Sequence, residues 1–204
     1  MFRFKALLSS FVEFDYEADY GTPDYTITTF PSTGTGVSSS TDCIVAVDAN
    51  ISSTDDGVLI EMGGSGGTGL AVGVNNGTLR ARAFKSIGAA WGTDADAAEV
   101  EADISSYTGS DATYYIVVDA SAFTLTVYVQ AGGKGSASAI VELGTDTTSG
   151  GGTTVYGSGA KGYGQDNSGI ADIGSAYEVN FNGTIDEIRI WTEDSGLDAS
   201  GFGS

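Results

Sequence analysis

The chain has no histidine, one cysteine and two prolines among its 204 residues. Without histidine, an imidazole general base and a Ser-His-Asp triad are both excluded. A lone cysteine cannot form an internal disulfide. Cys43 lies in the alternating run Cys43–Val47, which predicts a buried, small apolar side chain. The fold must therefore be held together by packing.

Positive charge is also scarce. Lys+Arg is 8 against 27 for Asp+Glu, so the formal net charge is −19. Such a surface repels DNA, RNA and anionic membranes, and we expect neither a nucleic-acid nor a membrane partner. A dense acidic coat is tolerated where salt screens it. It also makes Ca²⁺ a candidate ligand.

Glycine is abundant, at 31 residues, and separates short runs rich in β-branched residues. This pattern predicts an all-β sandwich. Asn76-Gly77 lies between two alternating runs and predicts a two-residue hairpin, because a type I′ turn needs positive φ at both central residues. The expected strands cover residues 43–48, 58–62, 70–74, 79–84, 114–119, 123–129 and 184–191.

The segment Gly183–Trp191 reads Gly-Thr-Ile-Asp-Glu-Ile-Arg-Ile-Trp. It resembles the end motif of the laminin-G-like, or concanavalin-A-like, jelly-roll family. Gly69–Arg82 resembles the family hairpin and Tyr114–Gly132 the following strand pair, in the same order, so the likeness covers roughly residues 40–195. The resemblance implies a concanavalin-A-like jelly-roll sandwich of two antiparallel sheets. Lectins, enzymes, adhesion modules and virion proteins all use this fold.

Strict alternation along this last strand makes a further prediction. Ile188 and Ile190 should face the core together with Asp186. Glu187 and Arg189 should face the other side, where they can pair with each other or across the sheet.

One domain suits this length. Residues 26–195 are expected to form the jelly roll and residues 196–204 a short tail. Residues 1–25 are aromatic-rich and form either an arm or the first strands. The start of the chain shows only weak features of a signal peptide.

A glycosidase activity would need paired carboxylates, and several jelly-roll glycosidases carry three carboxylates on one strand. The run Glu99-Val100-Glu101-Ala102-Asp103-Ile104 resembles that motif, but Ile104 occupies the position of its third carboxylate. Together with Asp94 and Asp96, the acidic residues of this run are interpreted as an exposed acidic loop. We therefore expect a protein that is not an enzyme.

Three sets of residues are candidates for binding. Each has a plain structural alternative: aromatic residues also pack, aspartates also sit in solvated turns, and basic residues also balance local charge. The carbohydrate-binding candidates are Trp91, Tyr107, Tyr156 and Tyr163. The metal candidates are Asp48, Asp55, Asp56, Asp166 and Asn167. The partner-docking candidates are Phe2, Arg3, Phe4, Lys5, Phe11, Arg80, Arg82 and Lys85, with Arg80 and Arg82 on the same side of one strand.

These observations predict a virion structural protein of a bacterial virus, either a capsid decoration (cement) protein or a tail or fibre subunit. It would lie on the virion surface, contact neighbouring virion subunits and form a homo-oligomer. The alternative is a secreted or cell-surface, lectin-like module that binds carbohydrate extracellularly, with Ca²⁺ as a candidate cofactor. The two overlap where a virion protein holds host glycan.

Overall fold

The computed structural model describes residues 22–30, 42–63, 69–84, 90–148, 160–166 and 172–192. The candidates Phe2, Arg3, Phe4, Lys5, Phe11, Lys85, Tyr156 and Asn167 lie outside these ranges, as does the expected tail. Within them the one helical element is a single 3₁₀ turn, η1 (Ser105–Tyr107). None of the described residues forms a helix that is long and apolar enough to span a membrane.

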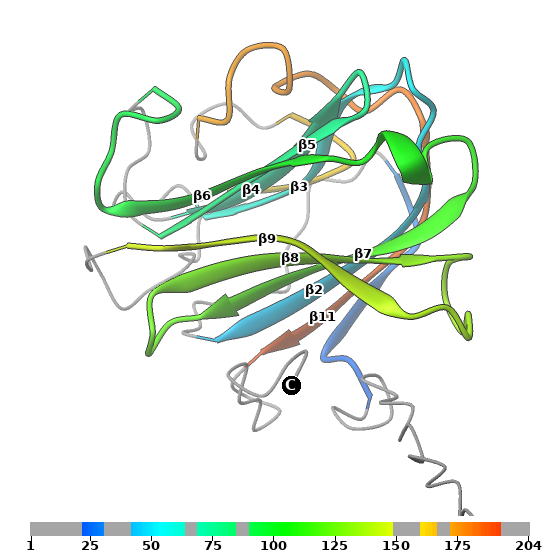
Figure 1. The fold of residues 1–204 in the computed structure, drawn as a ribbon, viewed down its shortest axis with the longest axis horizontal. Coiled ribbons are helices and arrows are strands. Elements are labelled where there is room, and N and C mark those ends of the chain that lie inside the picture. Colours follow the sequence, from blue (N-terminus) through cyan, green and yellow to red (C-terminus); the bar gives the residue numbers. More distant parts are fainter. Residues whose placement is uncertain are drawn as a thin grey trace, which may run out of the picture.

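The described strands form two sheets, stacked as two layers in Figure 1. Neighbouring strands in both sheets run antiparallel. The first sheet has the order β1 (Tyr25–Ile27), β11 (Thr184–Thr192), β2 (Cys43–Asn50), β7 (Asp111–Asp119), β8 (Thr124–Ala131) and β9 (Ile140–Thr147). The second has the order β10 (Ala160–Tyr163), β3 (Asp56–Gly63), β4 (Gly69–Asn75), β5 (Thr78–Phe84) and β6 (Ala97–Asp103).

The hydrophobic core fills the space between the two sheets. Alternate residues of each strand point into it, as on β8, where Leu125, Val127 and Val129 are all 0% exposed. Cys43 is buried, as its alternating run predicted. Ile188 and Ile190 are likewise 0% exposed, so the last strand lies against the core as expected.

The β4–β5 hairpin follows the predicted turn chemistry. Asn76 has φ 47° and Gly77 has φ 78°, so both central residues adopt the left-handed conformation that an Asn-Gly pair tolerates. Asn75 pairs with Thr78 across the turn. This hairpin fixes the register of β5, which carries Arg80 and Arg82.

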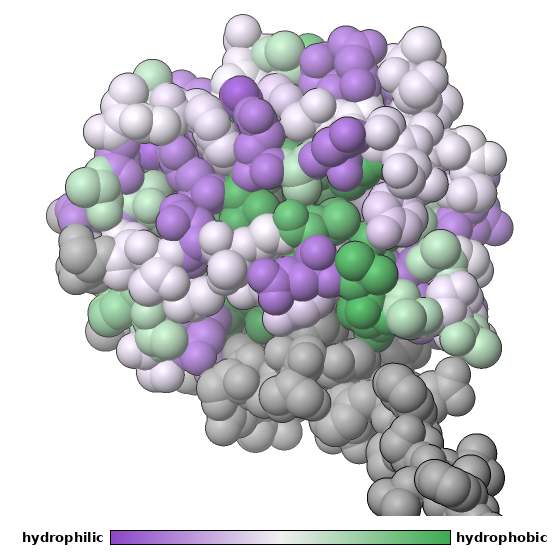
Figure 2. Space-filling view, viewed as in Figure 1, coloured by the Kyte–Doolittle hydropathy of each residue, from purple (hydrophilic) through white to green (hydrophobic). Residues whose placement is uncertain are grey.

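One side of the sandwich is closed by the edge strands β6 and β9, which contact each other across the two sheets. The Glu99 backbone N–H donates to Asp146 Oδ2 at 2.8 Å, and the Thr148 hydroxyl donates to the Ala95 carbonyl at 2.7 Å. Figure 2 shows a largely polar surface on this side, with an apolar area at the level where the sheets meet. Val141 of β9, 43% exposed, is the one large apolar residue of these two strands that counts as exposed.

Two sequence-based expectations are corrected here. Of the acidic residues interpreted as a loop, Glu99, Glu101 and Asp103 occupy alternate positions of the edge strand β6 (Ala97–Asp103), whereas Asp94 and Asp96 do lie in the loop before it. The alternation of β11 is broken by a bulge between Ile185 and Glu187. Because a bulge adds one residue to the strand, Ile185 packs on the core and Asp186 does not.

Candidate functional site

The outer face of the second sheet carries a ladder of opposite charges. Arg80 lies opposite Glu101 and Arg82 opposite Glu99, on the paired strands β5 and β6. Arg80 Nη2 is 2.7 Å from Glu101 Oε2, and Arg82 Nε is 3.2 Å from Glu99 Oε1. The first pair is open to water, with side chains 22% and 50% exposed, whereas the second is largely buried at 1% and 13%. Opposite charges facing each other across a sheet stabilise the pairing of the strands.

Arg80 is also enclosed by two aromatic rings. Its guanidinium carbon lies 4.6 Å from the centre of the Trp91 ring and 4.6 Å from that of the Tyr177 ring. Such stacking is attractive because the ring faces are electron-rich. Its Nη1 donates to the Ile173 carbonyl at 3.1 Å, and its Nε donates to Glu101 at 2.7 Å. We call Arg80, Trp91, Glu101 and Tyr177 the Trp91 site.

Trp91 is held by the loop that joins β5 to β6. The Gly92 N–H donates to Glu99 Oε2 at 2.7 Å, which ties the loop to strand β6. Gly92 has φ 75°, a conformation that glycine adopts without strain. Burial raises the pKa of Glu99, and the hydrogen bond from Gly92 and the positive charge of Arg82 act against that shift. The ring of Trp91 remains partly exposed at the surface.

Tyr177 is positioned by a tight turn of residues 172–178. Glu178 Oε1 accepts the N–H groups of Ile173 and Gly174 at 2.7 and 3.1 Å, and Asp172 Oδ1 also accepts from Gly174. Burial raises the pKa of Glu178, and its hydrogen bond with Asp172 adds to the shift. Gly174 lets the turn approach the sheet, since a Cβ there would lie 2.9 Å from Arg80 Nη1.

The chemistry of the Trp91 site is that of a binding surface. A partly exposed indole beside a half-exposed carboxylate offers an apolar platform and hydrogen-bond acceptors. Both rings, those of Trp91 and Tyr177, pack on the guanidinium of Arg80, which holds them in place before a ligand binds. Preorganised groups lose less entropy when a ligand binds.

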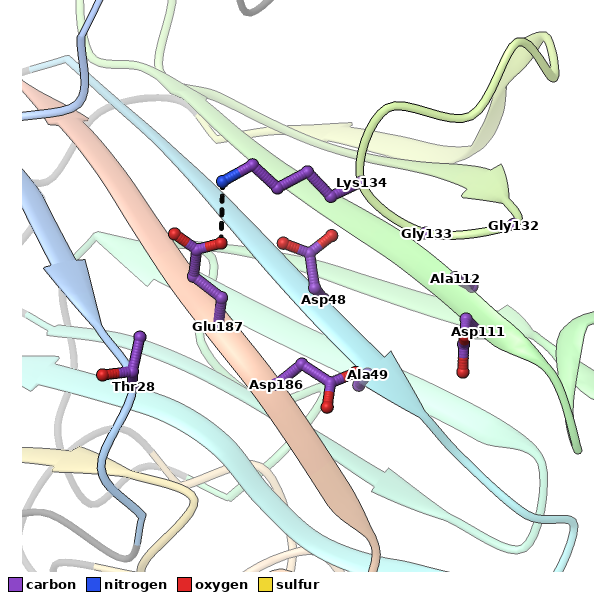
Figure 3. Close-up of a pocket in the computed structure, with 10 residues that line it drawn as sticks. All are labelled: Thr28, Asp48, Ala49, Asp111, Ala112, Gly132, Gly133, Lys134, Asp186 and Glu187. Atoms are coloured by element: carbon purple, nitrogen blue, oxygen red, sulfur yellow. Dashed lines mark hydrogen bonds and ion pairs between the residues drawn. The ribbon is translucent and has the colours of Figure 1, made fainter.

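A second feature lies on the outer face of the first sheet. It is a shallow hollow of about 340 Å³ between β2, β11 and the loop after β8 (Figure 3). Asp48 and Glu187 point to the same side from neighbouring strands, and Lys134 reaches across to Glu187 at 2.8 Å. The residues lining it are Thr28, Asp48, Ala49, Asp111, Ala112, Gly132, Gly133, Lys134, Asp186 and Glu187.

Asp48, one of the metal candidates, is committed to a buried ion pair. It is 5% exposed, accepts from Arg189 Nη2 at 2.5 Å and from the Thr113 hydroxyl at 2.5 Å. Burial raises the pKa of Asp48 to about 6, against the Thr113 bond. Burial lowers the pKa of Arg189 to about 10, so both groups are charged at pH 7. Glu187 lies 4.0 Å from Arg189 Nε, the pairing expected along this strand.

The other metal candidates that the structure describes, Asp55, Asp56 and Asp166, do not form a common metal site. Asp55 accepts from the N–H and hydroxyl of Ser52 and so closes a turn. The backbones of Asp56 and Asp166 donate to Asn182 and Asn180. Among the residues that the structure describes, no group of three or more His, Cys, Asp or Glu side chains is arranged to hold a metal ion.

The described sugar-binding candidates differ in how far their side chains are exposed to solvent. Trp91 is at the surface, in the site described above. Tyr107 is partly exposed and packs against the core from η1. Tyr163 is 2% exposed within the core, so it presents no ring face to a ligand. Burial accordingly raises the pKa of Tyr163 to about 12.

The docking candidates are also corrected in part. Arg80 and Arg82 do point to the same side of β5, as expected. Arg82 is only 1% exposed, and its Nη1 donates to the Asp172 carbonyl at 2.6 Å. It therefore stabilises the 172–178 turn and is not available to a partner.

Sequence reasoning missed Tyr177 and the turn that carries it. These residues follow the Gly-rich stretch 157–169 and belong to none of the expected strands. The only available signal was the pair Ile173 and Tyr177, two apolar side chains four positions apart among polar ones. Both are buried on the outer face of the sheet with Ala71.

No protein-family model matches the sequence, and no curated protein sequence matches it. Solved structures do. Mouse laminin α1 domains LG4-5 superimpose with a TM-score of 0.55 at 11% identity, over 82% of this chain and 41% of that one. The chain has the laminin-G-like, concanavalin-A-like jelly-roll fold. The match spans about two fifths of the length of the laminin fragment.

Two other jelly rolls are similar over most of their own length. The Ruminococcus gnavus IT-sialidase CBM40, bound to α2,3-sialyllactose, gives a TM-score of 0.51 at 10% identity over 83% of this chain and 92% of that one. The native heptameric SAP-like pentraxin from Limulus polyphemus gives 0.51 at 15% identity, over 83% and 73%. At these identities the likeness concerns the fold, and function must be argued from the site.

Proposed function

We propose that this protein is a lectin-like, carbohydrate-binding module that holds its ligand at the Trp91 site. The observation that carries the proposal is the stack of Trp91, Arg80 and Tyr177, with one indole partly exposed beside the half-exposed Glu101. Sugar rings present apolar C–H faces and hydroxyl edges, which match an aromatic platform flanked by an acceptor. A similar fold with α2,3-sialyllactose bound, the Ruminococcus gnavus domain, supports this choice.

The proposal includes binding without catalysis. The chain has no histidine. The carboxylates Glu99 and Glu101 on β6 are each paired with an arginine, which disfavours the proton transfers that a glycosidase requires. An extracellular location suits a glycan-binding module and is part of the same proposal.

The comparisons give no support to the virion role that the sequence favoured, and they fit its alternative better. Capsid or tail attachment, and the homo-oligomer, stay predictions. Size-exclusion chromatography with light scattering would measure the oligomeric state.

A glycan array followed by titration calorimetry tests the function. Trp91→Ala should weaken binding about tenfold or more, because truncating an aromatic residue at the centre of an interface removes much of the binding energy. Trp91→Phe keeps an aromatic face and should retain measurable binding. Both variants should keep the far-UV circular dichroism of the wild type, since Trp91 lies outside the core. Binding that is equal in Trp91→Ala and wild type would contradict the proposal.

A further inference from the structure

We infer that the Trp91 site selects neutral saccharides and rejects acidic ones such as sialylated or sulfated glycans. The inference rests on the proposed function and adds the class of ligand. It differs from what the fold comparison alone would suggest, because the similar Ruminococcus gnavus domain has a sialylated sugar bound.

The first argument is the local charge. Among the residues that the structure describes, the guanidiniums of Arg80 and Arg82 pair with the carboxylates of Glu101 and Glu99 on β6. Two further carboxyl groups, those of Asp172 and Glu178, lie in the turn over the sheet, where they accept backbone N–H bonds. The surroundings are therefore net negative, on a protein whose formal charge is −19. An anionic sugar would enter against this field, and like charges brought together in an interface weaken binding.

The second argument concerns Arg80, which among the described residues is the one cation of the site that reaches the surface. Recognition of a carboxylate by arginine normally uses two parallel N–H donors of the guanidinium fork. In Arg80, Nε and Nη2 are both directed at Glu101, and Nη1 donates to the Ile173 carbonyl. The ring centres of Trp91 and Tyr177 each lie 4.6 Å from its guanidinium carbon, and the rings so shield the group further. A sugar carboxylate would have to displace Glu101 before it could bind.

The third argument is that these same groups suit a neutral ligand. Glu101 keeps half of its side chain exposed while Arg80 holds it in place. A fixed carboxylate accepts hydrogen bonds from sugar hydroxyls, and charge-assisted bonds of this kind are stronger than neutral ones. Trp91 supplies the stacking surface beside it. Glu101 therefore acts in two ways, as an acceptor for hydroxyls and as a barrier to carboxylates.

The experiment compares matched pairs of glycans on an array and in calorimetry, with lactose and α2,3-sialyllactose as one pair. For the pairs that bind wild-type protein, we expect the neutral member to bind about tenfold or more tightly at low salt. Raising the salt to about 0.5 M should reduce the difference in affinity between the neutral and the acidic member, since screening weakens the repulsion. Glu101→Gln should also reduce this difference, because it frees Arg80 and removes one negative charge. Trp91→Ala should weaken binding of the neutral member about tenfold or more, as in the test of the proposed function.

The outcomes separate the two proposals. Equal or tighter binding of the acidic members, lost in Trp91→Ala, would overturn the selectivity for neutral sugars and leave the proposed function standing. Binding of no glycan, or binding that does not depend on Trp91, would overturn both. A gap between neutral and acidic members that Glu101→Gln leaves unchanged would also overturn the inference, because the barrier would then lie elsewhere.

Discussion

At the scale of single residues, Arg189 and Asp48 form a buried ion pair whose energy depends on both partners. Both side chains are nearly inaccessible, at 2% and 7% exposure, on the outer face of the first sheet. Removing charges from water is costly, and their mutual attraction repays this only while both partners are present. Their contribution should therefore depend on both residues and on pH.

We predict that Arg189→Met lowers the free energy of unfolding by about 3–5 kcal/mol at pH 7, because it leaves a buried carboxylate without its partner. The loss should shrink at pH 5. Asp48, whose pKa burial raises to about 6, is then largely protonated and needs no counter-charge. Urea titrations at the two pH values measure both effects.

The matched control is Lys134→Met, which removes the ion pair to Glu187 over the same hollow. Lys134 is 51% exposed, so its loss should cost less than about 1 kcal/mol. A cost for Arg189→Met that is as small as this, or equal at both pH values, would count against the buried-pair account.

At the same scale, the sequence predicted exposure to solvent correctly for only some of the candidate site residues. Trp91 was among the carbohydrate-binding candidates, and it is partly exposed at the surface. Tyr163 looked equivalent by composition but lies in the core, and Arg82 looked like a surface cation but is covered by the 172–178 turn. These differences depend on contacts between segments about 90 residues apart, which no local pattern records.

At the scale of elements, the β4–β5 hairpin positions Arg80, and its turn should be sensitive to substitution. Gly77→Ala should cost about 1 kcal/mol, because an alanine at φ 78° is strained. A Cβ there would meet Ser105 only at ordinary contact distance, 3.7 Å, so packing adds little. Chemical denaturation measures the change.

Gly77→Asn is the control for this backbone effect. Asparagine tolerates positive φ better than alanine, so it should cost less at the same position. If both substitutions have the same effect, the left-handed turn is not what limits stability at this hairpin.

The elements themselves were predictable where the chemistry of the sequence is strong. Aliphatic runs and the Asn-Gly turn correctly indicated β2, β3, β4, β5, β7, β8 and β11 to within a few residues. Strand β6 was missed because alternating carboxylates and alanines lack the aliphatic signal of a strand. Those carboxylates are accommodated by arginines of β5. The bulge in β11 was also missed, since it depends on pairing with β2.

At the scale of the whole molecule, the acidic composition should make stability fall as pH rises. Burial raises the pKa of Asp48, Glu99 and Glu178. The folded state therefore binds more protons than the unfolded state between about pH 4 and pH 6, and stability decreases through that window. Asp103, whose pKa is lowered by hydrogen bonds from Ser105, opposes the trend weakly because it is exposed.

We predict that the melting temperature is higher at pH 5 than at pH 7. Calorimetric scans at low salt and at about 0.5 M salt would separate two causes. General repulsion among surface charges is screened by salt, whereas the contribution of buried carboxyls should persist. A melting temperature that rises from pH 5 to pH 7 in both conditions would contradict this account.

The two tryptophans allow the most direct measurement of the central claim, that sugar binds at the Trp91 site. Trp91 is partly exposed, whereas Trp191 is 2% exposed on the opposite sheet. In a ¹⁵N–¹H spectrum each gives its own indole N–H signal. During titration with a neutral oligosaccharide chosen on the array, the Trp91 signal should shift while the Trp191 signal stays in place. A saturating ligand that leaves the Trp91 signal unmoved would show that the protein does not hold carbohydrate there.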